Sequence, residues 1–300
     1  MDGQQVVVAT DGGVDLNPEL INQLGIVIVP RRIQVGGRVY EISRKALARD
    51  VEARVGAGAR GVLSPPQLDD FLITYRECGR GGAAVVSVHP PNALDPSARL
   101  ARVAKNLVTP AINLQVFEAN TLGAGVGFMA QAAAQAALGD STLDQITILL
   151  SRLQSTVQTL FLTKDLKGLP TTAASTGLEG LKKGLLGSTY LLSVDRSSGA
   201  FKVEQEGSTI RLAKSAQLFN EITGPCNAWI AYRGMEGQAR QMQQELSRLP
   251  QLQIENVQMG RATLLTSSYF PGDFVQLLIY PAQAELERMR RWARSLAKWR

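Results

Sequence analysis

Short apolar segments alternate with amphipathic segments along the first 160 residues, and this alternation constrains the fold more than any other feature of the sequence. The apolar segments predict buried strands at Gln4–Thr10, Gly25–Pro30, Ala83–Val88 and Asn113–Glu118. Helical periodicity predicts helices at 44–55, 67–78, 95–106, 127–138 and 141–160, with a hairpin at 33–42 and a short crossover at 61–66. A strand–helix alternation is typical of an α/β domain with a mainly parallel sheet.

The pattern changes after Leu162. Ser188–Val194 and Gly199–Glu206 flank a Ser-Ser turn signal and predict a second hairpin. Further strands are predicted at 228–232, 253–257 and 274–280, with helices at 212–221 and 238–249. We therefore expect an α/β domain at 1–162, an α+β domain with antiparallel pairs at 163–281, and a basic amphipathic helix at 282–300.

The composition excludes several classes of protein. The chain of 300 residues is 45% hydrophobic and 19% charged, which argues against disorder. It holds no apolar run of the ~20 residues that a membrane-spanning helix needs. The opening MDGQQ lacks the features of a secretory signal, so we expect a cytoplasmic protein. Two cysteines and one histidine provide neither a disulfide framework nor a zinc site, so no metal or cofactor is expected.

The positive charge of the chain is concentrated at its end. Residues 285–300 hold six Lys/Arg and two Glu, whereas the net charge of the whole chain is +6. The remaining body is nearly neutral, which argues against a nucleic-acid partner. Apolar residues recur at helical spacing in this segment, and Trp292 and Trp299 flank them. The segment therefore predicts either docking on an anionic membrane surface or a helix that packs on its own domain with a solvated basic face.

Glycines and acidic residues at predicted strand ends leave an enzymatic interpretation open. Gly123, Gly125 and Gly127 follow a strand, but their spacing differs from the dinucleotide-binding pattern, and a close-packed turn explains them equally. Asp11 and Asp15 are four residues apart, which suits turn formation and helix capping better than phosphoryl transfer. The alternative function is an α/β enzyme that acts on a phosphorylated or nucleotide substrate.

Small polar residues recur in otherwise apolar loops. They are Ser64 in VLSPP, Asn92 in HPPN, and Ser267 and Ser268 in LLTSSYF. Such side chains donate hydrogen bonds but lack the acids and bases of catalysis, so they suit either the head group of an amphipathic ligand or simple turn capping. His89 ends a predicted strand, and a structural role is favoured over a catalytic one because no nucleophile motif accompanies it.

The order of the segments resembles the DegV family of bacterial fatty-acid-binding proteins from about Val6 to Tyr280. The opening VVVATDGGVDLNPELINQLGIVIVP is similar to the family's first strand, Thr-Asp-Ser turn, helix and second strand. IQVGGRVYEI resembles its hairpin, VLSPPQLDDF its Thr-Ser-Gln-Pro-Ser segment, and AVVSVHPPNALDPSARLA its strand with a following Ser-Ser pair. INLQVFEANTLGAGVGFMA and MGRATLLTSSYFPGDFVQLLIY resemble its glycine-rich helix entry and its terminal His-x-Gly-Pro-Gly segment.

The resemblance implies two domains that hold a long-chain fatty acid between them, with no catalysis by the chain itself. In some members a separate fatty-acid kinase phosphorylates the bound acid. The family's head-group loops correspond to the segments that hold Ser64 and Asn92; Leu63 stands at the family's Thr, Pro91 and Asn92 stand at its Ser-Ser pair, and Ser268 stands at its terminal His. Ser64, Asn92 and Ser268 are therefore the candidate donors to the head group, and Ser267, His89 and Arg261 are secondary candidates. Arg31, Arg32 or Arg261 could also supply a cation. These replacements argue against coupling to a kinase more than against lipid binding. A DegV-like interaction protein that has lost its ligand site is a further alternative.

Overall fold

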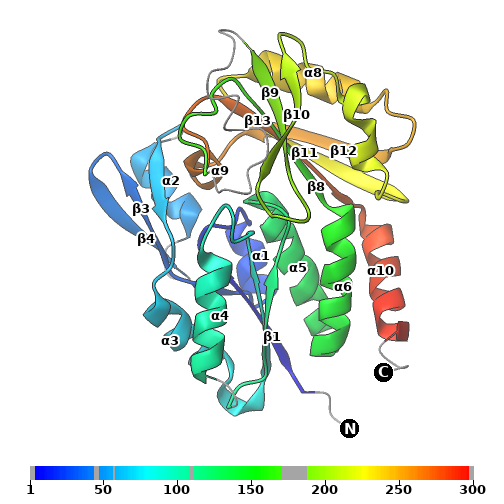
Figure 1. Cartoon of the computed structure of the whole chain (residues 1–300). Helices are drawn as coiled ribbons and strands as arrows, with labels where there is room; N and C mark the ends of the chain where they lie inside the picture. Colours follow the sequence, from blue (N-terminus) through cyan, green and yellow to red (C-terminus); the bar gives the residue numbers. More distant parts are fainter. Residues whose placement is uncertain (1–3, 44–46, 57, 109–110, 171–187, 297–300) are drawn as a thin grey trace.

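The structure is a computed structural model that describes residues 4–43, 47–56, 58–108, 111–170 and 188–296. Two layered units lie one above the other in Figure 1, with a parallel sheet in the lower unit and a larger sheet in the upper one. Residues 171–187 and the end of the basic segment, including Trp299, lie outside the described residues. Within the described ranges, no helix is long and apolar enough to cross a membrane.

The lower unit is built on the predicted parallel sheet. Its strands run in the order β2 (Val27–Val29), β1 (Val6–Asp11), β6 (Ala84–His89) and β7 (Leu114–Glu118), and every pair is parallel. Alternate strand residues pack beneath α3 (Leu68–Cys78) and α4 (Ser97–Val108) on one face and beneath α5 (Ala124–Leu138) and α6 (Leu143–Thr156) on the other. The α/β prediction for this part of the chain is confirmed.

The upper unit is a six-stranded sheet in the order β10-β9-β8-β13-β11-β12. Its strands are β8 (Gln158–Thr163), β9 (Thr189–Val194), β10 (Phe201–Gly207), β11 (Pro225–Arg233), β12 (Gln253–Arg261) and β13 (Phe274–Pro281). One face packs under the helix α8 (Glu236–Leu246) and the 3₁₀ helix η2 (Leu212–Phe219), and the other faces the lower unit. The predicted antiparallel pairs are present, but β11 and β12 are parallel because α8 connects them.

A third, small sheet contains the predicted hairpin and one further strand, β5 (Gly61–Ser64), that was not predicted. It consists of β3 (Arg31–Val35), β4 (Arg38–Ile42) and β5, and it packs on α2 (Ala48–Val55) and the short helix α9 (Leu264–Ser268). The crossover predicted at 61–66 is therefore wrong, since β5 pairs with β3. The alternating pattern of β5 is too short for detection, and its pairing depends on Gly61, where a Cβ would lie 2.7 Å from the Ile33 side chain.

The helix predicted at 141–160 is too long. It ends at Thr156 because Val157 is extended, and the following residues form the buried strand β8. A strand that is buried on both faces lacks the alternation that separates it from a helix. The predicted domain boundary after 162 falls within β8, and the division into 1–162, 163–281 and 282–300 stays a prediction.

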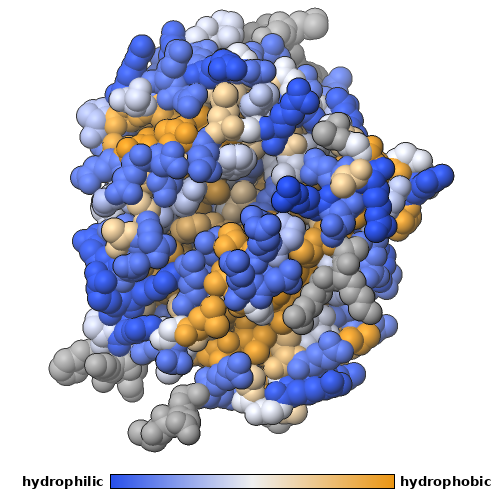
Figure 2. Space-filling view, turned by 180° about the vertical axis from the view of Figure 1, so that it is seen from behind, coloured by the Kyte–Doolittle hydropathy of each residue, from blue (hydrophilic) through white to orange (hydrophobic). Residues whose placement is uncertain are grey.

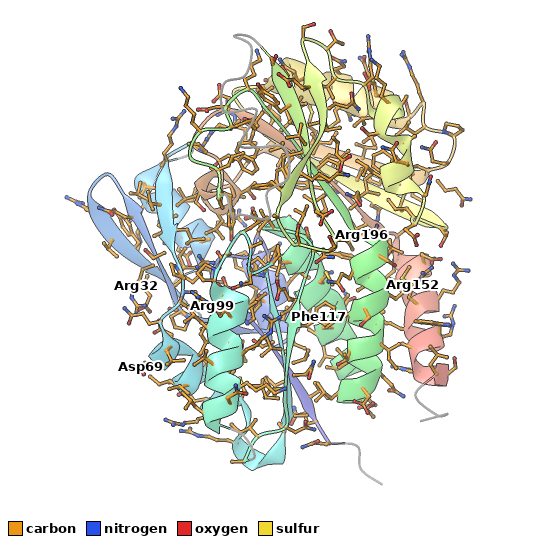
Figure 3. The ribbon with its side chains drawn as sticks, viewed as in Figure 1. Arg32, Asp69, Arg99, Phe117, Arg152 and Arg196 are labelled. Carbon is orange, nitrogen blue, oxygen red and sulfur yellow. The ribbon has the colours of Figure 1, made fainter. Side chains whose placement is uncertain are left out.

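The last helix returns to the lower unit. Helix α10 (Gln283–Leu296) lies beside α6 in Figure 1, and Leu286, Met289 and Ala293 join the core under the parallel sheet. A hydrogen bond also links the upper unit to the end of α6. Arg196, between β9 and β10, lies at the top of α6 (Figure 3), where its Nη2 donates to the Ser155 carbonyl at 2.7 Å.

Candidate functional site

Three segments that were predicted to hold a ligand head group meet around one small pocket, the head pocket, of about 150 Å³. The end of β5 contributes Leu63 and Pro65, the turn between β6 and α4 contributes Leu94 and Asp95, and the end of α9 contributes Ser268. These segments are far apart in the sequence. The fold therefore brings together the regions on which the sequence prediction depended.

The predicted head-group residues stand in different relations to this pocket. Ser268 lines it, and its hydroxyl donates to the Leu265 carbonyl at 2.7 Å. Ser64 is exposed beside the pocket, and its carbonyl accepts a hydrogen bond from Arg31 Nε at 2.8 Å. Asn92 is exposed in the turn after β6, and its backbone N–H donates to Glu118 at 2.7 Å. Ser64 and Asn92 would have to turn inward to reach a ligand.

The buried guanidinium of Arg31, one of the three arginines that could supply a cation, lines the head pocket. Arg31 is 1% exposed, and it donates to Asp11 and to Asp95 at 2.9 Å each. Burial alone would raise the pKa of Asp11, but the charge of Arg31 and a hydrogen bond with His89 hold this pKa well below its ordinary range. Among the described residues that line the pocket, Arg31 is the one cation, and two carboxyl groups surround it.

His89 belongs to a buried hydrogen-bond chain, as its predicted structural role requires. Its Nδ1 lies 2.8 Å from Asp11 Oδ2, and its Nε2 lies 2.7 Å from Ser87 Oγ, which also accepts a hydrogen bond from the Tyr75 hydroxyl at 2.9 Å. The order Ser–His–Asp is that of a hydrolase triad. However, Ser87, His89 and Asp11 are all 0% exposed, and none of them lines the head pocket. This series of hydrogen bonds therefore links β1 to β6.

The other secondary candidates lie elsewhere. Ser267 is buried, and its carbonyl accepts a hydrogen bond from Arg233 at 3.4 Å. Arg233 also donates to the Phe270 carbonyl at 2.6 Å, so it fixes the connection between α9 and β13. Arg261 is exposed and lines a different cavity from Ser268. The structure does not bring Arg261 to the head pocket.

An aromatic cluster continues inward from the head pocket. We define it as Phe161, Phe201, Phe270 and Phe274. Leu94 and Tyr269, which line the pocket, pack in the same apolar core. The ring centroid of Phe270 lies 4.7 Å from that of Phe161 and 4.7 Å from that of Phe274. These rings fill the space between the upper sheet and the lower unit.

A larger groove of about 720 Å³ opens between the two units. Its walls come from α1 (Pro18–Gln23), α2 and α5 below and from β11, β12 and β13 above. Its large apolar side chains are Leu16, Leu20, Phe128, Trp229, Leu278, Tyr280 and Leu286. Figure 2 views the molecule from behind and shows apolar residues in a hollow near the middle of this face. The volume lies within the range of small-molecule sites, roughly 300–1,000 Å³.

Strand β13 leads from the aromatic cluster to the groove. Because side chains alternate along a strand, Phe274, Gln276, Leu278 and Tyr280 share the face toward the lower unit, whereas the residues between them pack beneath α8. From Phe274 to Tyr280 the strand spans roughly 20 Å at ~3.4 Å per residue. An extended long acyl chain has a comparable length.

Asp15 connects the two units at the edge of the groove. Its Oδ2 accepts a hydrogen bond from Thr263 Oγ1 at 2.5 Å and another from Thr266 Oγ1. Burial raises the pKa of Asp15, and the two hydroxyl groups offset only part of this effect. The side chain therefore serves as a hydrogen-bond acceptor that joins the segment before α1 to α9.

The glycines after β7 serve close packing. A Cβ at Gly125 would lie 1.9 Å from Thr121 Oγ1, and one at Gly127 would lie 2.7 Å from the Asp15 carbonyl. These close contacts explain why positions 125 and 127 are glycine, so no bound nucleotide is needed to explain them.

The cysteines do not suit catalysis either. Burial raises the pKa of the Cys78 and Cys226 thiols to about 11, so neither suits nucleophilic catalysis. In the described ranges, no group of three His, Cys, Asp or Glu side chains could hold a metal ion.

Sequence comparisons place the chain among known proteins. A sequence profile described as an uncharacterised protein of the DegV family matches residues 5–267. A DegV domain-containing protein of Listeria monocytogenes is 24% identical over 185 residues, which cover 61% of this chain and 65% of that protein. One from Staphylococcus aureus is 22% identical over 125 residues, covering 42% of this chain and 44% of that protein. The match thus spans less than two thirds of the length of these two relatives.

Solved structures show the same fold. A fatty-acid-binding DegV family protein from Thermus thermophilus has a TM-score of 0.72 at 20% identity, covering 93% of this chain and 100% of that one. DegV of Bacillus subtilis, a fatty acid binding protein, has a TM-score of 0.67 at 18% identity with the same coverage. A stearic-acid-binding protein from Eubacterium ventriosum has a TM-score of 0.67 at 15% identity, covering 94% and 99%.

Proposed function

Because the chain belongs to the DegV family, we propose that it binds one long-chain fatty acid between its two units and acts as a non-enzymatic lipid carrier. The relatives from Thermus thermophilus, Bacillus subtilis and Eubacterium ventriosum bind fatty acids. The observation in this chain that carries the proposal is the convergence of three distant segments on the head pocket, which continues into the aromatic cluster.

Uncharged donors hold the head group in this proposal. Ser64 and Asn92 turn inward to donate O–H and N–H groups, and the Ser268 hydroxyl, which lines the head pocket, exchanges its bond to the Leu265 carbonyl for one to the ligand. Burial raises the pKa of the Tyr269 hydroxyl well above its ordinary value, so it stays an O–H group. A buried carboxylate without partners costs several kcal/mol, so these donors orient the ligand even though most of the affinity arises elsewhere.

Burial of the acyl chain supplies most of the affinity. Each buried methylene contributes about 0.8 kcal/mol, and fourteen contribute about 11 kcal/mol before ordering costs. The head pocket of about 150 Å³ is too small for such a chain. The tail must therefore pass between the rings of the aromatic cluster and follow β13 toward the groove, which requires Phe161 and Phe270 to turn aside.

The electrostatics of the head pocket disfavour the enzymatic alternative. A phosphate group needs cations, and Arg31 already donates to two carboxyl groups. The same argument opposes retention of a phosphorylated acid, so contact with a fatty-acid kinase stays a prediction that this pocket does not favour.

Removal of the predicted donors tests the proposal. We expect the S64A/N92A/S268A variant to lose bound fatty acid, measured by mass spectrometry of an organic extract after delipidation and reloading with stearic acid. The S247A/N256A variant, changed at exposed positions far from the pocket, is the control and should retain it. Equal lipid content in both variants would refute the assignment of the head group, and absence of lipid from the wild type would refute the function.

We further propose that the protein acts in the cytoplasm and touches an anionic membrane surface through α10 when lipid is loaded or delivered. The buried side of α10 packs mainly on the lower unit, which supports a structural role for the helix, but exposed side chains beside that side and on the far side support surface contact. Trp292 is 44% and Leu296 41% exposed, and the exposed Arg288 and Arg291 lie on the same helix. Such a combination of aromatic, apolar and basic side chains suits an interfacial helix.

A further inference from the structure

Gln276 is a buried polar side chain without a partner. It lies in the middle of β13 and is 0% exposed. Neither its amide nitrogen nor its amide oxygen forms a hydrogen bond with the part of the chain that the structure describes. An unpaired buried amide is costly and uncommon in folded proteins, and an apolar residue would avoid the cost. The side-chain amide of Gln276 therefore lacks the polar partner that a buried amide normally has.

The surroundings of Gln276 lie on the path that the acyl chain takes in the proposed function. In the sheet register, Gln276 faces Phe161 of β8 on one side and Ala231 of β11 on the other. Phe161 belongs to the aromatic cluster, and Ala231 lines the groove. The amide thus lies between the two, about two strand residues, or roughly 7 Å, from Phe274.

Neighbouring hydroxyl groups are already engaged. Thr159 lies opposite Leu278 in the register, and its Oγ1 is 2.6 Å from Thr121 Oγ1. These side chains satisfy one another, so the free donor and acceptor of Gln276 remain available to a ligand.

We propose that Gln276 pairs with an oxygen function within the acyl chain, so that the preferred ligand is a hydroxylated long-chain fatty acid. A hydroxyl group offers one donor and one acceptor, which complement the amide oxygen and the amide N–H, whereas a methylene chain offers neither. This inference rests on the proposed function, since it takes the acyl path along β13 as given. Gln276 then determines specificity, and the burial of methylenes supplies the affinity.

Competition between defined acids tests this specificity. The delipidated full-length protein is offered stearic acid against monohydroxystearic acids that differ in the position of the hydroxyl group. We expect at least one isomer to bind the wild type about tenfold more tightly than stearic acid, which corresponds to about 1.4 kcal/mol. The Q276L variant should bind stearic acid at least as well as the wild type and lose the preference. Q253L, at an exposed position of β12, should keep it.

The outcomes separate this inference from the function on which it rests. If stearic acid and every isomer bind the wild type equally, or if Q276L keeps the preference, Gln276 pairs with internal water and the inference fails while the lipid-binding proposal stands. If no acid binds the wild type, the proposed function fails first. Q276M keeps the length of the side chain and replaces Q276L if that variant does not fold.

Discussion

Arg31 shows how one buried residue can join three parts of the chain. It contacts Asp11 at the end of β1, Asp95 before α4 and the backbone of Ser64 at the end of β5. A buried ion pair adds little net stability compared with apolar packing, but the loss of one partner is severe because the other charge stays buried and unpaired. The network therefore fixes the geometry of the head pocket.

Replacement of Arg31 should destabilise the fold strongly. We expect R31M to lower the free energy of unfolding by about 3–5 kcal/mol, because two buried carboxyl groups lose their cation. The neighbouring R32M breaks a partly exposed pair with Asp70 and should cost at most about 1 kcal/mol. Urea denaturation at neutral pH measures both. Similar losses of unfolding free energy in R31M and R32M would show that the buried ion pairs contribute no more to stability than the partly exposed pair.

The same network predicts an acid dependence of stability. The pKa of Asp11 is lower in the folded state than its ordinary value of 3.8, so the unfolded chain binds the proton more readily. Its contribution is complete above the unfolded value and is lost as the pH falls toward the folded value. We expect the unfolding free energy of the wild type to fall below about pH 4 more steeply than that of D11N. Parallel curves for the two proteins would contradict this assignment.

For the residues around the head pocket, the sequence predicted the segments that hold them but not the contacts between their side chains. Ser64, Asn92 and Ser268 were found because polar residues in apolar loops are conspicuous. The ion pair between Arg31 and Asp95 was missed because it joins positions 64 residues apart, and no local pattern reveals it. Gln276 was not identified as a binding residue, because one polar residue in an otherwise apolar strand gives only a weak indication of a site.

Helix α10 shows how one element serves two surfaces. Its buried side places Leu286, Met289 and Ala293 in the core of the lower unit, whereas Trp292, at the border of this side, and Arg291, on the far side, are exposed. The amphipathic period predicted the helix from the sequence, but it could not show which side is covered. By contrast, β5 and β8 escaped prediction because one is very short and the other is buried on both faces.

The exposed side of α10 should govern contact with vesicles. We expect the R291E/W292A variant to sediment less with anionic vesicles than the wild type, without loss of thermal stability, because both side chains are exposed. The I73A/R76E variant on α3 is a matched control with one exposed apolar and one basic position. Unchanged sedimentation of R291E/W292A would remove the membrane proposal.

The buried side of α10 should govern stability instead. We expect L286A to lower the free energy of unfolding by about 2–5 kcal/mol, because the substitution leaves a cavity in the core. For the same reason, a chain truncated before α10 would be a poor test of membrane contact. Denaturation of L286A and W292A in parallel measures the difference, and equal stability would contradict the observed packing.

In the whole molecule, the proposed ligand path lies between the two units, each of which turns one face toward the other. The upper sheet presents the aromatic cluster and the alternate residues of β13, and the lower unit presents α1, α2 and α5. The alternation of strands and helices predicted the parallel sheet of the lower unit, and the hairpin pattern after Leu162 predicted the antiparallel pairs of the upper unit. The space between them could not be predicted, because its shape depends on ring packing between distant residues such as Phe161 and Phe270.

Removal of one ring should open this path. We expect F161A to lose about 3–5 kcal/mol of stability and to recover part of it when stearic acid is added, because the acyl chain fills the cavity. F219A removes a ring of the same size from the core beneath α8 and should lose stability without recovery. Calorimetry with and without the acid compares them. Equal recovery in both would show that the acid does not follow β13.

The central claim is that one acyl ligand occupies the space between the two units. Native mass spectrometry of the wild-type protein, as purified and after incubation with excess long-chain fatty acid, tests it most directly. We predict a complex of one chain with one fatty acid that persists through buffer exchange and disappears on denaturation. A spectrum that shows only the bare polypeptide under both conditions would contradict the account.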